Sequence, residues 1–277
     1  MIRGRSHRTL TRRLTLKILF MHDWRGHGGA YSPYLPYERF VAAQEKMARR
    51  RIEGLTIHDS LIITTHPPTI TMGAGSLNKQ LASIRPLPPR IKESNDSDDL
   101  LLAQAASYLW RNYRINLIKT NRGGSVWYHD HGVLQLYLIA EVEPFAITNI
   151  IYPLEEILLR VLSDAGVTVA RAAKEVRQQN KSFIGIWVAE KKIAALGIRI
   201  TGNGKHFVSM FGASINVKRC KQNSTLIDPC GILNCQMTSI ANELNDDYNI
   251  SYAMLVPIIC KHMQDVFGAQ IILRTAP

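Results

Sequence analysis

Apolar and polar residues follow two different periods along the chain, and these periods predict its strands and helices. Short apolar runs rich in β-branched residues, SLIITTH over 60–66 and VLQLYLIAE over 133–141, predict strands. Over 151–166 apolar residues recur at helical spacing, at Leu154, Ile157, Leu158, Val161 and Leu162. Pro153 in the first turn and Gly166 at the stop bound this predicted helix.

The second half of the chain mixes both periods. Two strands around a tight turn near Glu190 and Lys191 are predicted over 183–200, and a further strand over 206–217. Other helices are predicted over 100–113, 235–244 and 253–268. Because strands and helices do not alternate regularly, the pattern favours an α+β fold with a mixed β-sheet and flanking helices over a doubly wound one.

Composition and charge narrow the class of protein. Hydrophobic residues make up 46% of the 277 and charged ones 20%, and no run approaches the roughly 20 apolar residues of a membrane span. A globular protein without a membrane partner is expected. The net charge of +12 indicates anionic partners. The first 20 residues carry six Lys or Arg and no acid. We therefore expect a basic extension over 1–29 and a single domain over 30–277.

The basic segment has two interpretations. It is a tail or first strand of a bacterial cytoplasmic protein, or it is a mitochondrial transit peptide, since such peptides are rich in arginine and poor in acids.

The cysteines offer one candidate nucleophile. They lie at Cys220, Cys230, Cys235 and Cys260, without a CxxC pair or a histidine at zinc-finger spacing, so no metal site is expected. Pro229 and Gly231 bracket Cys230 and hold it on a sharp turn. A nucleophilic cysteine must be a thiolate, whereas a free thiol has a pKa of about 8.5. Lys192, at the start of an apolar strand, could supply the stabilising charge, or could simply point to solvent.

A glycine-rich stretch, TNRGGSVWYHDHG over 120–132, offers a candidate binding wall. Gly123 and Gly124 would let a ligand approach the backbone closely, with Arg122, Tyr128 and His129 around it. Taken alone, this stretch is weak evidence for a site, because glycine-rich turns are common, and an ordinary turn explains it better.

Five segments occur in an order and at spacings that resemble the lipoyl(octanoyl) transferase family, over roughly residues 30 to 250. Its HPPxxTxG, RGGxVTYHGPGQ, GVWVxxxKIAAIG, HGxALNV and PCGxxxxxxTS elements are similar to THPPTITMG, RGGSVWYHDHG, GIWVAEKKIAALGIRI, FGASINV and DPCGILNCQMTSI. YERFVAAQ resembles its opening helix. The resemblance implies a biotin/lipoate protein ligase-like fold.

The resemblance also implies an activity without metal or nucleotide cofactor. An octanoyl group would pass from octanoyl-acyl carrier protein to a lysine of lipoyl domains, in 2-oxoacid dehydrogenases and the glycine cleavage H protein. The nucleophile falls on Cys230 and the thiolate-stabilising amine on Lys192. The acyl-binding positions fall on Arg122, Gly123, Gly124, Ser125, Val126, Trp127, Tyr128, His129, Ala195, Leu196, Gly197, Gly212, Ala213 and Ser214. A monomer with a positive surface would attract its acidic partners.

The sequence departs from the family at several positions. HGPGQ reads His129-Asp130-His131-Gly132-Val133, Trp127 replaces a threonine, and Phe211 replaces a histidine. About 20 extra residues lie mostly within 90–112. These departures touch the substrate slot and leave the Cys230 and Lys192 pair intact.

Two alternatives remain open. An ATP-dependent lipoate or biotin-type ligase of the same fold needs a nucleotide site and no cysteine nucleophile, so the PCG element favours the transferase. A degenerate, non-catalytic homologue or a nucleic-acid-binding protein is the other alternative. The retained Cys230 and Lys192 argue against decay, and no RNA-binding signature supports a nucleic-acid partner.

Overall fold

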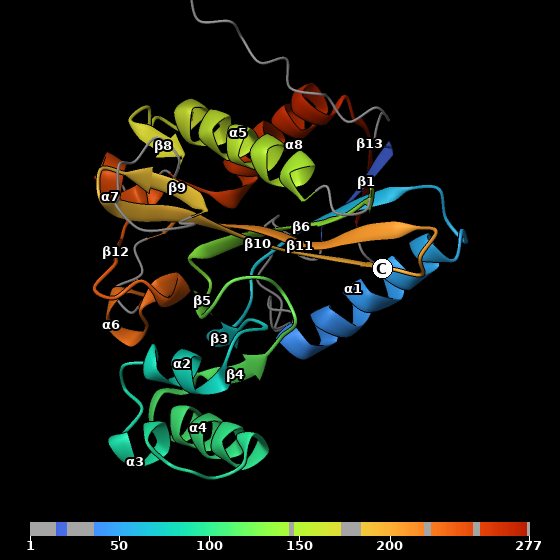
Figure 1. Cartoon of the computed structure of the whole chain (residues 1–277). Helices are drawn as coiled ribbons and strands as arrows, with labels where there is room; N and C mark the ends of the chain where they lie inside the picture. The colour runs from blue at the N-terminus through green and yellow to red at the C-terminus, as the bar shows by residue number, and fades with distance from the viewer. Residues whose placement is uncertain are drawn as a thin grey trace, which may run out of the picture.

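A ten-stranded mixed sheet forms the centre of the molecule in the computed structural model, which describes residues 15–20, 36–143, 147–172, 184–218, 223–245 and 250–275 (Figure 1). Along the sheet the strands are β13 (Gln270–Thr275), β1 (Thr15–Phe20), β2 (Asp59–Thr64), β6 (Val133–Ile139), β11 (Phe207–Asn216), β10 (Lys191–Gly202), β9 (Gly185–Val188) and β8 (Ala170–Ala172). Two short strands join this path: β7 (Glu141–Val142) pairs with β11, and β12 (Gln236–Met237) pairs with β10. The predicted α+β class with a mixed sheet is confirmed.

Helices cover both faces of the sheet. One face packs against α5 (Thr148–Asp164) and α8 (Tyr252–Phe267), and the other packs against α1 (Tyr37–Ile52) (Figure 1). The five apolar residues that predicted a helix over 151–166 are all buried in the core between α5, α8 and the sheet. The helix begins three residues before 151, however, so Pro153 lies inside it and not in its first turn.

A smaller lobe lies below the large sheet in the view of Figure 1 and has a hydrophobic core of its own. Its three-stranded sheet has the order β4 (Asn116–Lys119), β3 (Thr69–Met72) and β5 (Trp127–His129). Three helices pack on it: α2 (Leu77–Ala82), α3 (Pro89–Lys92) and α4 (Asp98–Tyr113). The helix predicted over 100–113 is α4, whose first turn is capped by the Ser97 hydroxyl, which accepts from the N–H of Leu100. The extra segment over 90–112 thus builds α3 and α4.

The helix predicted over 235–244 is wrong in its first half. Gln236 and Met237 form β12, which pairs in parallel with the start of β10, and only α7 (Ile240–Leu244) is helical. The helix starts later than predicted, because the Ser239 hydroxyl accepts from the N–H of Asn242 and caps it there. The N–H of Thr238 donates to the carbonyl of Lys192 at 2.9 Å. This segment therefore fixes the strand that carries Lys192.

The other predicted elements are confirmed. The strands expected within 60–66, 133–141, 183–200 and 206–217 are β2, β6, the β9–β10 hairpin and β11, and α8 ends at Gly268 as expected. Residues Thr15–Phe20 fall in the segment expected as a basic extension and form β1, between β2 and β13. The first-strand interpretation describes these six residues, and the remaining domain division stays a prediction. In the described part of the chain, no helix is long and apolar enough to cross a membrane.

Candidate active site

Lys192 and Cys230 meet at the junction of the large sheet and the smaller lobe. The Nζ of Lys192 lies 3.2 Å from the Sγ of Cys230 and donates to the carbonyl of Ile184 at 3.0 Å. The ammonium also stands 5.2 Å from the centre of the Trp187 ring, a cation–π contact. The Lys192 side chain is fully buried. The solvent-facing interpretation of this lysine is therefore wrong.

The β9–β10 hairpin directs Lys192 inward. Lys191 is exposed and Lys192 buried, and the pairing with β9 shifts register between Lys192 and Ala194. Gly185 on β9 has a φ of +141°, and a Cβ there would lie 2.7 Å from the Cε of Lys192. Only glycine leaves room for the lysine stem. Gly185 was not among the predicted site residues, although it is the first residue of the segment GIWVAEKKIAALGIRI that contains Lys192.

Cys230 sits on a turn with an unusual backbone. The segment Pro229–Gly231 is a single 3₁₀ turn in which Cys230 has φ +58° and ψ 18°, the left-handed region. Its N–H donates to the carbonyl of Val126 at 3.0 Å. Asp228 secures the turn, because its carboxylate accepts from the guanidinium of Arg85 at 2.7 Å and from the N–H of Asn234 at 3.2 Å. The thiol is thus presented on a turn tied to the smaller lobe.

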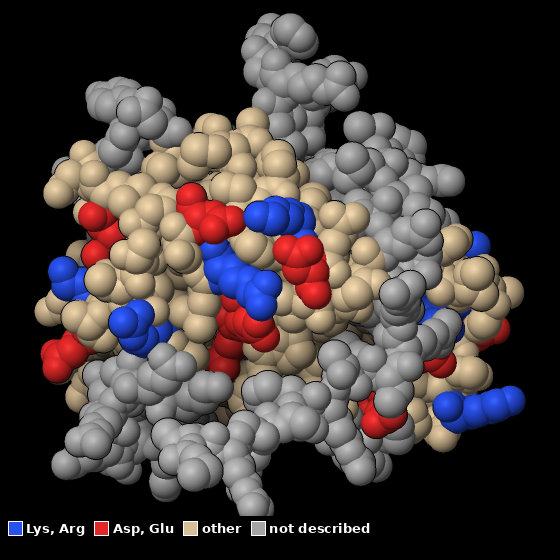
Figure 2. Space-filling model, turned by 90° about the horizontal axis from the view of Figure 1, so that it is seen from above, with Lys and Arg blue, Asp and Glu red and all other residues tan. Residues whose placement is uncertain are grey.

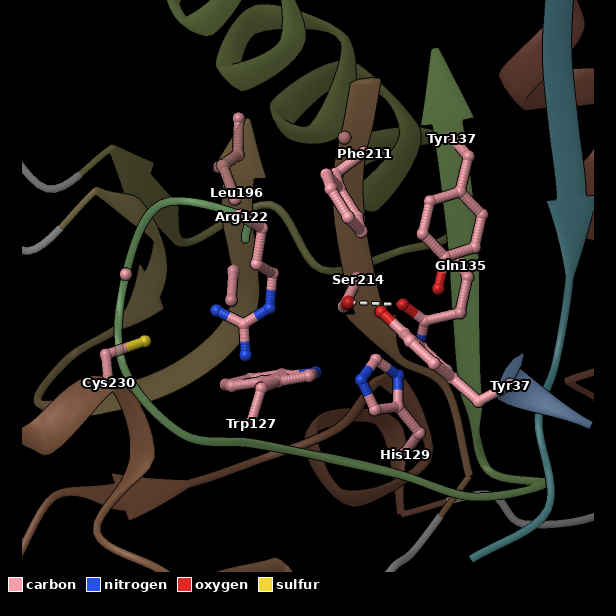
Figure 3. Close-up of a pocket in the computed structure, with 15 residues that line it drawn as sticks. Tyr37, Arg122, Trp127, His129, Gln135, Tyr137, Leu196, Phe211, Ser214 and Cys230 are labelled. Carbon is pink, nitrogen blue, oxygen red and sulfur yellow. Dashed lines mark hydrogen bonds between the residues drawn. The ribbon is translucent and has the colours of Figure 1, made fainter. Parts of the chain in front are cut away.

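A pocket of about 430 Å³, part of it open to solvent, extends from Cys230 to Tyr37 and Tyr137 (Figure 3). Residues predicted to bind the acyl group line it from three segments: Arg122, Gly124, Trp127, His129, Ala195, Leu196, Gly197, Gly212, Ala213 and Ser214. The first four belong to the glycine-rich stretch and the rest to β10 and β11. These three segments, which are distant in sequence, therefore line one pocket that has the Cys230 thiol at its end.

Four of the predicted acyl-binding residues do not line this pocket. Val126 and Tyr128 are buried in the core of the smaller lobe, because successive residues of β5 point to opposite faces. Trp127 and His129 occupy the pocket face instead. Gly123 and Ser125 lie in the loop before β5 and also stay outside the lining.

Three pocket residues were missed from the sequence, Tyr37, Gln135 and Tyr137, whereas Phe211 was expected at the substrate slot as a departure from the family pattern. Gln135 and Tyr137 are two residues apart on β6, so they share a face, and this polar-aromatic spacing within an apolar strand was a usable signal. The hydroxyl of Ser214 lies 2.5 Å from the Oε1 of Gln135, its cross-strand partner (Figure 3). Tyr37, at the start of α1, gave no such signal.

Arg122 supplies a buried positive charge to the pocket. Its guanidinium donates to the hydroxyl of Thr71 at 2.8 Å, to the carbonyl of Thr71 at 3.1 Å and to the carbonyl of Gly123 at 3.0 Å. The Nε2 of His129 lies 3.0 Å from the same hydroxyl. Burial, and then the charges of His66 and Arg122, hold the pKa of His129 well below 6.5. His129 is therefore neutral at physiological pH.

Two buried tyrosines of the pocket are also uncharged at physiological pH. Burial raises the pKa of Tyr37 and raises that of Tyr137 well above 10. Within the described ranges, no group of three or more His, Cys, Asp or Glu side chains is placed to hold a metal ion. The arrangement presents one thiol beside one amine, at the end of a pocket whose other described side chains are mostly neutral.

Comparison with known proteins places the chain in a family. Residues 36–264 match the Lipoyl protein ligase A/B catalytic domain. The chain belongs to this family. It is 28% identical to an octanoyltransferase of Alkaliphilus metalliredigens, over 85% of this chain and 93% of that protein. It is 30% identical to an octanoyltransferase of Dictyoglomus turgidum, over 84% of each.

Solved structures show the same fold. A lipoate-protein ligase A bound with ATP superposes with a TM-score of 0.64 at 15% identity, over 96% of this chain and 90% of that one. A bi-partite lipoate protein ligase of Thermoplasma acidophilum gives a TM-score of 0.59 at 12% identity, over 95% and 88%. At these identities the likeness concerns the fold alone. The expected lipoate protein ligase-like architecture is confirmed.

Proposed function

We propose that this protein is an octanoyltransferase that moves an acyl group from acyl carrier protein to a lysine of lipoyl domains, with Cys230 as nucleophile. The observation that carries the proposal is the 3.2 Å contact between the Cys230 sulfur and the buried Lys192 ammonium, at the end of a pocket. The named octanoyltransferase relatives support the reaction class. Apart from Arg122, the side chains that line the pocket beside the thiol are uncharged, which suits an acyl chain.

The first half-reaction loads the enzyme. The ammonium of Lys192 favours an ionised sulfur on Cys230, because an opposite charge at this distance stabilises the thiolate. The sulfur attacks the thioester carbonyl carbon, and a new S–C bond forms while the carbon–sulfur bond of the donor breaks. The departing donor thiolate takes a proton from Lys192. One thioester replaces another, so this step changes the free energy little, and it leaves Lys192 as a neutral amine.

The second half-reaction unloads it. The lysine amine of the acceptor attacks the acyl-cysteine carbonyl, forming an N–C bond while the Cys230 thiolate departs. The neutral Lys192 amine accepts the proton that the nucleophilic nitrogen must lose, which restores the starting thiolate and ammonium. The amide is more stable than the thioester, so this step runs downhill. Division of one transfer into two easier ones is covalent catalysis.

The pocket segments would hold the chain between these steps. The acyl carbons would lie against Ala195-Leu196-Gly197 and Gly212-Ala213-Ser214, with Arg122, Trp127 and His129 opposite. Each buried methylene contributes on the order of 0.8 kcal/mol. The proposed active residues are thus Cys230 and Lys192, and the pocket residues position the acyl group.

Charge would bring the partners together. The net charge of +12 favours encounter with acidic proteins, as acyl carrier proteins and lipoyl domains are as a rule, mainly through the association rate. In the view of Figure 2, basic and acidic side chains intermingle on the described surface, so that face carries no basic patch. Attraction through the net charge should weaken as the salt concentration rises.

Intact mass spectrometry tests the proposal. Mixing the protein with octanoyl-acyl carrier protein should add one octanoyl group, removable by hydroxylamine and located at Cys230 by peptide mapping. Adding a lipoyl domain should then move the group to that domain. If the enzyme instead loads free octanoate only with ATP and without a cysteine adduct, the ligase alternative is correct and this proposal is wrong.

A further inference from the structure

The pocket has a direction, which the pairing of β10 and β11 defines. Lys192, beside the thiol, lies near the start of β10, and the pairs that follow are Ala195 with Ser214, Gly197 with Gly212 and Ile198 with Phe211. Six residues separate Lys192 from Ile198, about 20 Å along a strand. A chain attached to Cys230 that follows these strands therefore reaches Phe211 after Ala195 and Gly197, on the side of the pocket where Tyr137 also lies.

The strand residues that line the pocket before this point are mostly small, with Leu196 as the exception. Ala195 and Gly197 fill little of the space, and Gly212 lets β11 lie close to β6, because a Cβ there would collide with the carbonyl of Leu136. Phe211 is the next residue and carries a full aromatic ring (Figure 3). The size of the floor residues changes abruptly there.

Phe211 reaches the pocket through an unusual backbone. Alternation along β11 would place Phe211 with Ala213 and Ile215, on the face covered by α5 and α8. Its φ of +67° is rare for a bulky residue, and it instead packs with Phe40 and Tyr137 in the core beside α1. A strained aromatic residue displaced from its regular face is a candidate for a functional role.

The ring of Phe211 cannot retreat easily. It is 2% exposed, and the rings of Phe40 and Tyr137 within the same cluster lie 4.1 Å apart. Dense packing of this kind resists displacement by an added methylene. Phe211 also occupies the position at which the family element HGxALNV has histidine, so this part of the pocket differs from the family pattern.

We infer that Phe211 closes the far end of the acyl slot and sets the longest acyl chain that this protein accepts. The inference rests on the proposed function and deepens it. Chains that end before the ring stay buried in the slot, whereas each methylene that would pass the ring must stay outside the slot and loses its burial. A buried methylene is worth roughly fourfold in affinity at 25 °C. Removal of the ring should therefore favour longer chains by roughly fourfold for each methylene that becomes buried.

The test compares acylation of Cys230 by acyl carrier protein loaded with chains of six, eight, ten and twelve carbons. For Phe211→Ala and Phe211→Gly, we expect the decanoyl-to-octanoyl ratio of kcat/KM to rise on the order of tenfold, from two buried methylenes. Glycine also suits the positive φ, so the second variant relieves backbone strain. Phe211→Leu, a smaller change, should give an intermediate ratio.

Met210→Ala is the matched control. Met210 is buried in the same cluster but does not line the pocket. This variant should destabilise the protein and leave the chain-length ratio unchanged, because loss of folded enzyme lowers all four rates equally. An unchanged ratio in all three Phe211 variants, with octanoyl acylation retained, overturns the inference alone. Failure of the wild-type protein to form any acyl-cysteine overturns the proposed function and this inference with it.

Discussion

The amino group of Lys192 lies 3.2 Å from the sulfur of Cys230, although 38 residues separate them. The pair is held from both sides. Thr238, eight residues after Cys230, donates to the carbonyl of Lys192, and Cys230 itself donates to the carbonyl of Val126. The catalytic pairing that we propose is thus built into the backbone hydrogen bonds that join the sheet to the smaller lobe.

Loss of the thiol should abolish transfer. We expect Cys230→Ala to lower the rate by at least roughly 10²-fold, because removal of a nucleophile removes the covalent route. Circular dichroism should show that the variant stays folded. Cys235→Ala is the control. Cys235 lies five residues after Cys230 on the same loop, and the variant that lacks its thiol should keep most of the activity. Substantial octanoyl transfer by Cys230→Ala would contradict the mechanism.

Loss of the Lys192 charge should make the thiol less reactive. An opposite charge this close stabilises the thiolate, so Lys192→Met should slow alkylation of Cys230 at pH 7 by about tenfold or more. Iodoacetamide labelling followed by peptide mass spectrometry measures the rate. Lys191→Met removes an exposed neighbouring charge and should change the rate little. Equal rates in both variants would show that the ammonium of Lys192 does not activate the sulfur.

The described cysteines should differ sharply in reactivity. Burial raises the pKa of the Cys235 thiol to about 11 and that of Cys260 to about 11. Both should remain protonated thiols at pH 7, with only about 10⁻⁴ of each ionised. Limited iodoacetamide treatment should therefore label Cys230 well before these two, as peptide mapping can show. Faster labelling of Cys235 than of Cys230 would argue against an activated thiol at position 230.

Much of the architecture could be predicted from hydrophobic spacing, because the core imposes it. The apolar stripe from Leu154 to Leu162 predicted a helix, and the runs at 133–141 and 206–217 predicted strands. The structure has α5, β6 and β11 there. Gln236 and Met237 were assigned to a helix because nothing local reveals their pairing with Lys191 and Lys192. Such parallel pairing depends on contacts between segments far apart in sequence.

The pocket was predicted only in part for a similar reason. The resemblance located Cys230, Lys192 and three lining segments, but treated Arg122 to His129 as one unit. Alternation along β5 then divides that unit, with Trp127 in the pocket and Tyr128 in the smaller core. Phe211 faces the pocket through a positive φ, which hydrophobic periodicity does not predict.

Gly185 should be essential for the position of Lys192. In Gly185→Ala the new Cβ would lie 2.7 Å from the lysine Cε and 2.5 Å from the carbonyl of Ala194, so the side chain or the hairpin must move. We expect the rate of Cys230 acylation to fall by about tenfold or more, because a displaced Lys192 would no longer stabilise the thiolate. The loss should be similar to the one expected for Lys192→Met. Gly204→Ala is the control, because Gly204 also has a positive φ, +90°, yet nothing lies within 4 Å of its new Cβ. Equal losses in both would assign the effect to backbone strain alone.

His129 should make the stability of the fold depend on pH. Its pKa is held well below 6.5 in the folded protein, by burial first and then by the charges of His66 and Arg122. In the unfolded chain the same ring takes up a proton near pH 6.5. The unfolded state therefore binds more protons between these two values. The free energy of unfolding must then fall as the pH drops below 6.5, by up to about 1.4 kcal/mol per pH unit for this one group.

Urea denaturation at pH 7.5, 6.5 and 5.5 measures this dependence. His129→Gln should be less stable than the wild-type protein at pH 7.5, since the buried ring is lost, yet should lose less stability on going to pH 5.5. His131→Gln is the comparison, because burial lowers the pKa of that exposed histidine less strongly and the effect should be smaller. A pH dependence in His129→Gln as steep as that of the wild-type protein would mean that another group sets the acid sensitivity of the fold.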